Sequence, residues 1–104
     1  MYNTAGFQAG DGIKIVTNKS KDQVWAIVME LTKKIKLEMS ECDKEKGIIR
    51  GWAAPGKGSL TATMAIFIYV SEKNPSKIVI SVVSSPAWTS AIISDIREEL
   101  DILD

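Results

Sequence analysis

The chain has 104 residues and no net formal charge, because 13 lysines and arginines balance 13 acidic residues. This length accommodates a single hydrophobic core, and an apolar content of 45% excludes a chain that is disordered throughout. With no histidine and one cysteine, the sequence excludes histidine-based catalysis, Cys/His zinc sites and internal disulfides.

Residues 1–11 are expected to form a loosely ordered N-terminal segment that precedes a single domain over residues 12–104. The segment has neither the basic start nor the apolar run of a signal peptide. No stretch of the chain approaches the roughly 20 apolar residues that span a bilayer, so no membrane span is expected. A lone Cys42 suits a reducing compartment, and we therefore expect a cytoplasmic location.

The first elements along the chain are a strand and a helix. Alternating residues over 12–17 predict the strand, which ends at a polar break. Ser20 and Gln23 are spaced as a capping box, in which each side chain caps a backbone N–H near the start of a helix. An apolar stripe at helical spacing then predicts a helix over residues 21–35, carried by Val24, Ile27, Val28, Leu31 and Ile35, with Trp25 and Met29 beside it.

Four strands and a second helix follow. Alternation predicts strands over residues 37–42, 48–53, 60–71 and 77–84, which are separated by short turns rich in Gly, Pro, Asn and charged residues. In the first of these strands, Leu37, Met39 and Glu41 are expected on one face. Apolar residues at helical spacing predict the last helix over residues 87–102.

This order predicts an α+β fold in two layers, an antiparallel sheet with both helices on one face and the element order β-α-β-β-β-β-α. Short turns favour antiparallel pairing of the last four strands, and each helix must bury its one apolar stripe. The order of elements over residues 12–103 resembles the TBP-like arrangement of the TATA-binding repeat and the helix-grip lipid-binding domains. The resemblance implies this fold, and either a nucleic acid bound by the sheet or an apolar ligand between sheet and helices.

Several motifs resemble sites, but their context favours ordinary structure. Residues 51–57 match the spacing GxxxxGK of a phosphate-binding loop, yet Gly58 occupies the Ser/Thr position and a strand, not a helix, is predicted next. We interpret this segment as a hairpin loop. The acidic cluster before Gly47 alternates in sign with lysines, which is typical of a solvated turn and not of a calcium loop.

Two further groups of polar residues receive the same interpretation. Asp95 and Glu99 share one face of the last helix, but no nucleophile or metal cluster accompanies them, so we expect a solvated surface. Cys42 lies between Glu41 and Asp43, which is the wrong environment for a reactive thiolate. We therefore predict no catalytic residues, no metal site and no cofactor, and we expect that the protein is not an enzyme.

The sheet offers a more specific candidate. If the face of residues 60–70 that carries Met64 and Ile66 lies under the helices, the opposite face is uncovered and amphipathic. An exposed apolar patch of that kind usually marks an interface, although scattered exposed apolar residues are also common. The leading hypothesis is therefore a binding module that self-associates as a homodimer through this open face, with an interface formed by Trp52, Phe67, Tyr69, Val79 and Val83.

The alternatives are of other classes. A small carrier would hold an apolar ligand between sheet and helices, with Met29, Met39 and Met64 as an adaptable lining. Nucleic-acid binding is not expected, because the open face lacks the lysines and arginines that phosphates require. Trp25 is expected to pack on the core, whereas Trp88 is either a packing anchor or a pocket rim.

The zero net charge conceals an uneven distribution. Residues 14–36 contain six lysines against two acidic residues, whereas residues 91–104 contain five acidic residues against one arginine. If the two helices lie side by side, these charges attract each other. Alternatively, they form oppositely charged patches that orient a partner or a second copy.

Overall fold

The computed structural model describes residues 8, 10, 12–53, 62–84 and 86–100, with the backbone alone for residues 62 and 86–91. It is an α+β fold with a five-stranded antiparallel sheet and two helices, as the sequence predicts. The expectation for residues 1–11 falls almost entirely outside the described residues. In chain order the elements are β1 (Ile13–Thr17), α1 (Lys21–Lys34), β2 (Glu38–Asp43), β3 (Ile48–Ala53), β4 (Ala62–Val70), β5 (Ile78–Ser84) and α2 (Pro86–Leu100).

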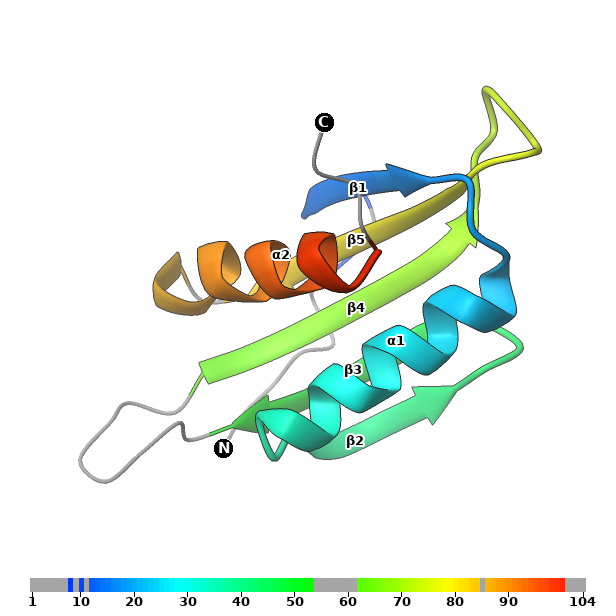
Figure 1. Ribbon diagram of the computed structural model, residues 1–104. Coiled ribbons are helices and arrows are strands. Elements are labelled where there is room, and N and C mark those ends of the chain that lie inside the picture. The colour runs from blue at the N-terminus through cyan, green and yellow to red at the C-terminus, as the bar shows by residue number, and fades with distance from the viewer. Residues whose placement is uncertain (1–7, 9, 11, 54–61, 85, 101–104) are drawn as a thin grey trace.

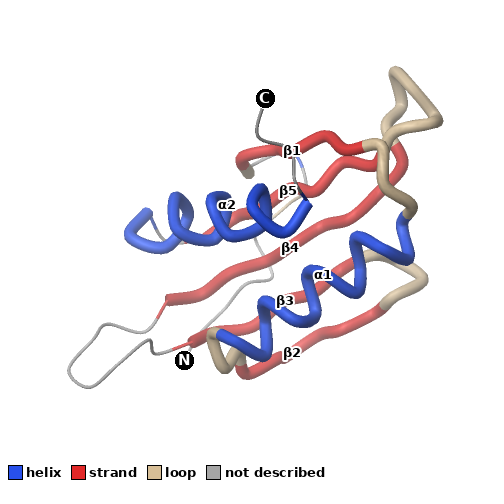
Figure 2. The backbone as a smooth tube through the Cα atoms, in the orientation of Figure 1, coloured by secondary structure: helices blue, strands red, loops and turns tan. Residues whose placement is uncertain are grey.

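The sheet has the order β1-β5-β4-β3-β2, and every neighbouring pair is antiparallel. The four later strands form the expected meander, and β1 adds to its far side by pairing with β5. Both helices lie in front of the sheet (Figure 1), and the tube view shows the same two layers (Figure 2). We call the side that the helices cover the inner face and the opposite side the outer face.

Helix α1 begins where the capping box predicts. The Ser20 side chain accepts a hydrogen bond from the Gln23 N–H at 3.1 Å, and the Gln23 side chain accepts one from the Ser20 N–H at 3.0 Å. Val24, Val28 and Leu31 of the predicted stripe are buried, while Trp25 and Met29 are half-buried against the core. Thr32 is also buried. Its hydroxyl donates to the Met29 carbonyl, so the buried polar group keeps a hydrogen-bond partner.

The core lies between the inner face and the two helices. Met64, Ile66 and Ile68 of β4 are fully buried at its centre, as the predicted inward face of this strand requires. Helix α2 completes the layer with four buried aliphatic side chains at helical spacing, and it lies over β5 and β1. Those four residues are Ile92, Ile93, Ile96 and Leu100.

Strand β2 differs from the prediction in its side-chain pattern. The register against β3 shifts between Met39 and Glu41, which is a β-bulge. The extra residue reverses the alternation, so Glu41 turns to the outer face opposite Arg50, while Met39 stays inward. The prediction that Met39 and Glu41 share a face is therefore wrong, because alternation holds only where pairing is regular.

Candidate functional site

The register of the sheet brings the five predicted interface residues to the outer face. Tyr69 pairs with Val79, and Phe67, two residues before Tyr69 on β4, points to the same side. Trp52 lies opposite Thr63, which places it on this face as well. Val83 joins them through its pairing with Ala65. Because both helices lie on the inner face, no helix or strand of the described residues is layered over these five side chains.

The centre of the outer face is less exposed than expected. Phe67 and Val79 are each only 6% exposed, whereas Trp52, Tyr69 and Val83 are half-buried. The expectation of an open apolar surface is therefore wrong for Phe67 and Val79. Large side chains flank both residues: Arg50 lies over the Phe67 ring, and Val79 stands between Tyr69 and Val16 in the register.

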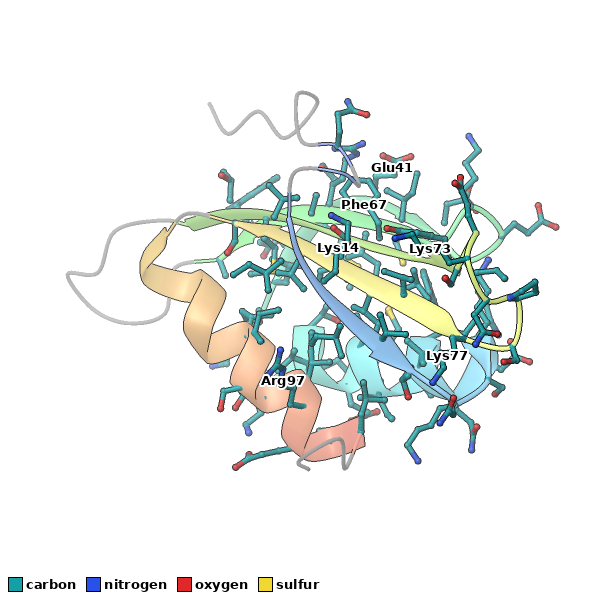
Figure 3. The ribbon with its side chains drawn as sticks, turned by 90° about the horizontal axis from the view of Figure 1, so that it is seen from above. Lys14, Glu41, Phe67, Lys73, Lys77 and Arg97 are labelled. Atoms are coloured by element: carbon teal, nitrogen blue, oxygen red, sulfur yellow. The ribbon has the colours of Figure 1, made fainter. Side chains whose placement is uncertain are left out.

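A salt bridge and a cation–π contact lie on the β2 and β3 side of the outer face. The Arg50 Nε donates to the Glu41 Oε1 at 2.9 Å, and the guanidinium carbon lies 5.2 Å from the centroid of the Phe67 ring. Glu41 and Phe67 lie on the side of the sheet away from the helix that carries Arg97 (Figure 3). The Arg50 side chain is only 15% exposed, so this polar pair is fixed more firmly than a surface ion pair.

Replacing Arg50 with methionine tests this arrangement. We expect R50M to lower the free energy of unfolding by about 1 kcal/mol, because it removes both the pairing with Glu41 and the contact with Phe67. Urea denaturation measures the change. The matched control is K33M, since the ion pair of Lys33 with Glu30 is largely exposed and its loss should have no measurable effect. Equal stability of R50M and the unmodified chain would contradict the structural role of Arg50.

Val16 extends the outer face at the β1 margin. It pairs with Val79 and is 47% exposed, so the row Tyr69, Val79 and Val16 runs across three strands toward an exposed end. Sequence reasoning did not select Arg50 or Val16. The spacing of Arg50 two residues before Trp52 in β3 could have placed Arg50 on the same face. The position of Val16 depends on the pairing of β1 with β5, which cannot be inferred from the sequence.

A groove of about 540 Å³ lies between the two helices. Ile27 and Leu31 contribute its apolar lining, and the remaining lining side chains are charged. Lys33 and Lys34 stand on the α1 side, and no ion pair joins them across the groove to the carboxylates of α2, namely Asp95, Glu98 and Glu99. The α2 wall is thus acidic, whereas the α1 wall carries two lysines together with Glu30, which pairs with Lys33 at 3.6 Å.

The predicted methionine lining is not part of this groove. Met64 is fully buried in the core, and Met29 and Met39 pack against the core from the side of α1 and β2. The exposed Cys42 lies beside them, with its Sγ 4.0 Å from the Met29 Sδ. These sulfur-containing side chains thus fill space between α1 and the sheet.

The remaining candidates keep their structural interpretation or lie outside the described residues. Residues 54–57 of the GxxxxGK match lie in the undescribed segment 54–61, but β3 and β4 on either side pair antiparallel with each other. The side chain of Trp88 is also outside the described part. Within the residues that the structure describes, no group of three or more Cys, Asp or Glu side chains is arranged to hold a metal ion, and no helix is long and apolar enough to cross a membrane.

No protein-family model matches the chain, and no curated protein matches it.

Proposed function

We propose that the protein is a non-enzymatic interaction module that self-associates as a homodimer through the outer face of its sheet. The observation that carries this proposal is the register, which collects Trp52, Phe67, Tyr69, Val79 and Val83 on the face that neither helix covers. A face of this composition resembles a protein interface, because aromatic and aliphatic side chains stand beside an arginine.

The contact surface differs from the one expected from sequence. Phe67 and Val79 are already buried and therefore offer little accessible area to a partner. Trp52, Tyr69 and Val83 keep accessible area, and Val16 adds an exposed aliphatic side chain at the margin. The pair of Arg50 on β3 and Glu41 on β2 supplies fixed polar groups at one side of this surface, which give an interface its orientation more than its affinity.

The other functional expectations are part of the same proposal. The element order and the antiparallel sheet support the proposal that the fold belongs to the TBP-like group. The absence of histidine and of a nucleophile motif supports a non-enzymatic role. The single cysteine supports a cytoplasmic location.

The carrier hypothesis has weaker support. The inner face is closed by fully buried aliphatic side chains, among them Ile66, Ile80 and Ile96, where an apolar ligand would have to lie. The groove between the helices has a volume that suits a small ligand, but six of its eight lining residues are charged. We therefore favour the interaction module over the carrier.

The substitution Tyr69→Lys tests the proposed dimer. A charge at this half-buried position should prevent burial of the outer face, so light scattering on a sizing column should give a lower mass than that of the unmodified chain at the same concentration. The matched control is Val70→Lys, which changes the adjacent, 49% exposed residue on the inner side of the same strand. The proposal fails if Y69K and V70K leave the mass equally unchanged.

A further inference from the structure

Strand β1 forms one margin of the sheet, and its exposed apolar side chains are unusual for an edge. Within the described residues β1 pairs with β5 alone, and alternate residues of an edge strand direct their N–H and C=O groups away from the sheet. Ile13 is 48% exposed on the inner side, and Val16 is 47% exposed on the outer side. The only charged side chain of the strand is that of Lys14.

The opposite margin, β2, is protected against pairing with another strand. It carries the bulge between Met39 and Glu41, which interrupts regular hydrogen bonding. It also carries three carboxylates, on Glu38, Glu41 and Asp43. Bulges and charged side chains are the usual devices that keep an edge strand unpaired. β1 has no bulge in its register with β5 and a single charge, so the two margins differ in their capacity to accept a strand.

We propose that β1 is a second self-association surface, on which the β1 strand of another copy pairs antiparallel about Ile15. In this register all five residues of the strand find a partner: Ile15 faces Ile15, Ile13 faces Thr17, and Lys14 faces Val16. The two Lys14 side chains are then not opposite each other, as they would be in a register centred on Lys14. The register thus avoids opposing like charges, and the pairing produces a continuous ten-stranded sheet.

The expected contact is a modest one. Five paired residues span roughly 17 Å, which places the contact at the small end of specific interfaces. We therefore expect a dimer that forms reversibly in the range of about 1 to 500 µM. This surface is distinct from the proposed outer-face interface, and a chain that uses both forms assemblies larger than a dimer at high concentration.

The experiment uses opposite charges at Val16 in a chain that already carries Tyr69→Lys, so that only the edge contact remains. Sedimentation velocity measures the mass across that concentration range. V16K places a lysine opposite Lys14 of the other copy twice in each dimer, and the dissociation constant should rise about tenfold or more. V16E places a carboxylate there, and the dimer should be at least as stable as with valine.

The double change K14E with V16K serves as the rescue, because it restores opposite charges across the same pairs. It should return the dissociation constant to that of the V16E chain, which also shows that V16K acts through charge and not through misfolding. The inference is overturned if the Y69K chain stays monomeric over the whole range, if V16K and V16E weaken the dimer equally, or if the double change restores nothing. A failure of the outer-face proposal shows differently, as an unchanged mass when Tyr69→Lys is introduced.

Discussion

Replacing Ile66 with alanine should lower the free energy of unfolding by about 4 kcal/mol. Ile66 is fully buried on β4, between Ile49 of β3 and Val82 of β5, and the helices close the space above it. Alanine would leave a cavity lined by neighbours that are held in place by the sheet, so little relaxation can refill it. Urea denaturation, followed by far-UV circular dichroism, measures the loss.

Val70→Ala is the matched control for this change. Val70 lies on the same strand and the same side of the sheet, but it is exposed, so its truncation should cost less than about 1 kcal/mol. If I66A were as mild as V70A, the inner face of β4 would not be the centre of the core, and the assignment of inner and outer faces would be wrong.

Replacing Gly47 with alanine should cost about 3 kcal/mol. Gly47 has a φ of +68° in the turn between β2 and β3, a conformation that side chains with a Cβ rarely adopt. A Cβ at this position would also collide with the backbone carbonyl oxygen of Ile68. That carbonyl cannot move aside easily, because the Ile68 N–H is hydrogen-bonded to the Gly47 carbonyl at 2.8 Å.

Gly10→Ala is the control for the change at Gly47. A Cβ at Gly10 would meet no atom within 4 Å, so this substitution should leave the melting temperature nearly unchanged. G47A should melt well below the unmodified chain in the same calorimetric scan. Similar melting of G47A and G10A would mean that the turn accommodates a side chain, contrary to the geometry described.

The parts of the fold that the sequence predicted correctly depend on local chemistry. The capping reciprocity of Ser20 and Gln23 involves only neighbours in the chain, and it marked the start of α1 correctly. The alternation of β4 likewise separated Met64 and Ile66 from Phe67 and Tyr69 without knowledge of any partner strand. Such signals are readable because they repeat with the period of the element itself.

The features that escaped prediction depend on contacts between distant segments. The bulge in β2 exists only relative to β3, so the turning of Glu41 to the outer face has no local signal. The contact of Arg50 with the Phe67 ring likewise joins residues that are 17 positions apart and lie on neighbouring strands. The exposed end of the outer face at Val16 depends on the pairing of β1 with β5.

The difference between the two edge strands also depends on contacts between distant segments, because the order of strands in the sheet decides which strands are edges. The acidic residues Glu38, Glu41 and Asp43 of β2 were visible in the sequence, where their cluster indicated only a solvated turn. These carboxylates protect an edge strand against pairing, which can be recognised only once β2 is known to lie at the end of the sheet. β1 lies at the other end of the sheet and carries a single charge, so it lacks the carboxylates that protect β2 against pairing.

The mass of the unmodified chain in solution tests the central claim, self-association through the sheet, most directly. Sedimentation equilibrium over about 1 to 500 µM should show a mass that rises with concentration. It should reach at least twice the 11.4 kDa of the single chain. A mass that stays at 11.4 kDa over the whole range would contradict both the outer-face dimer and the pairing of β1 strands.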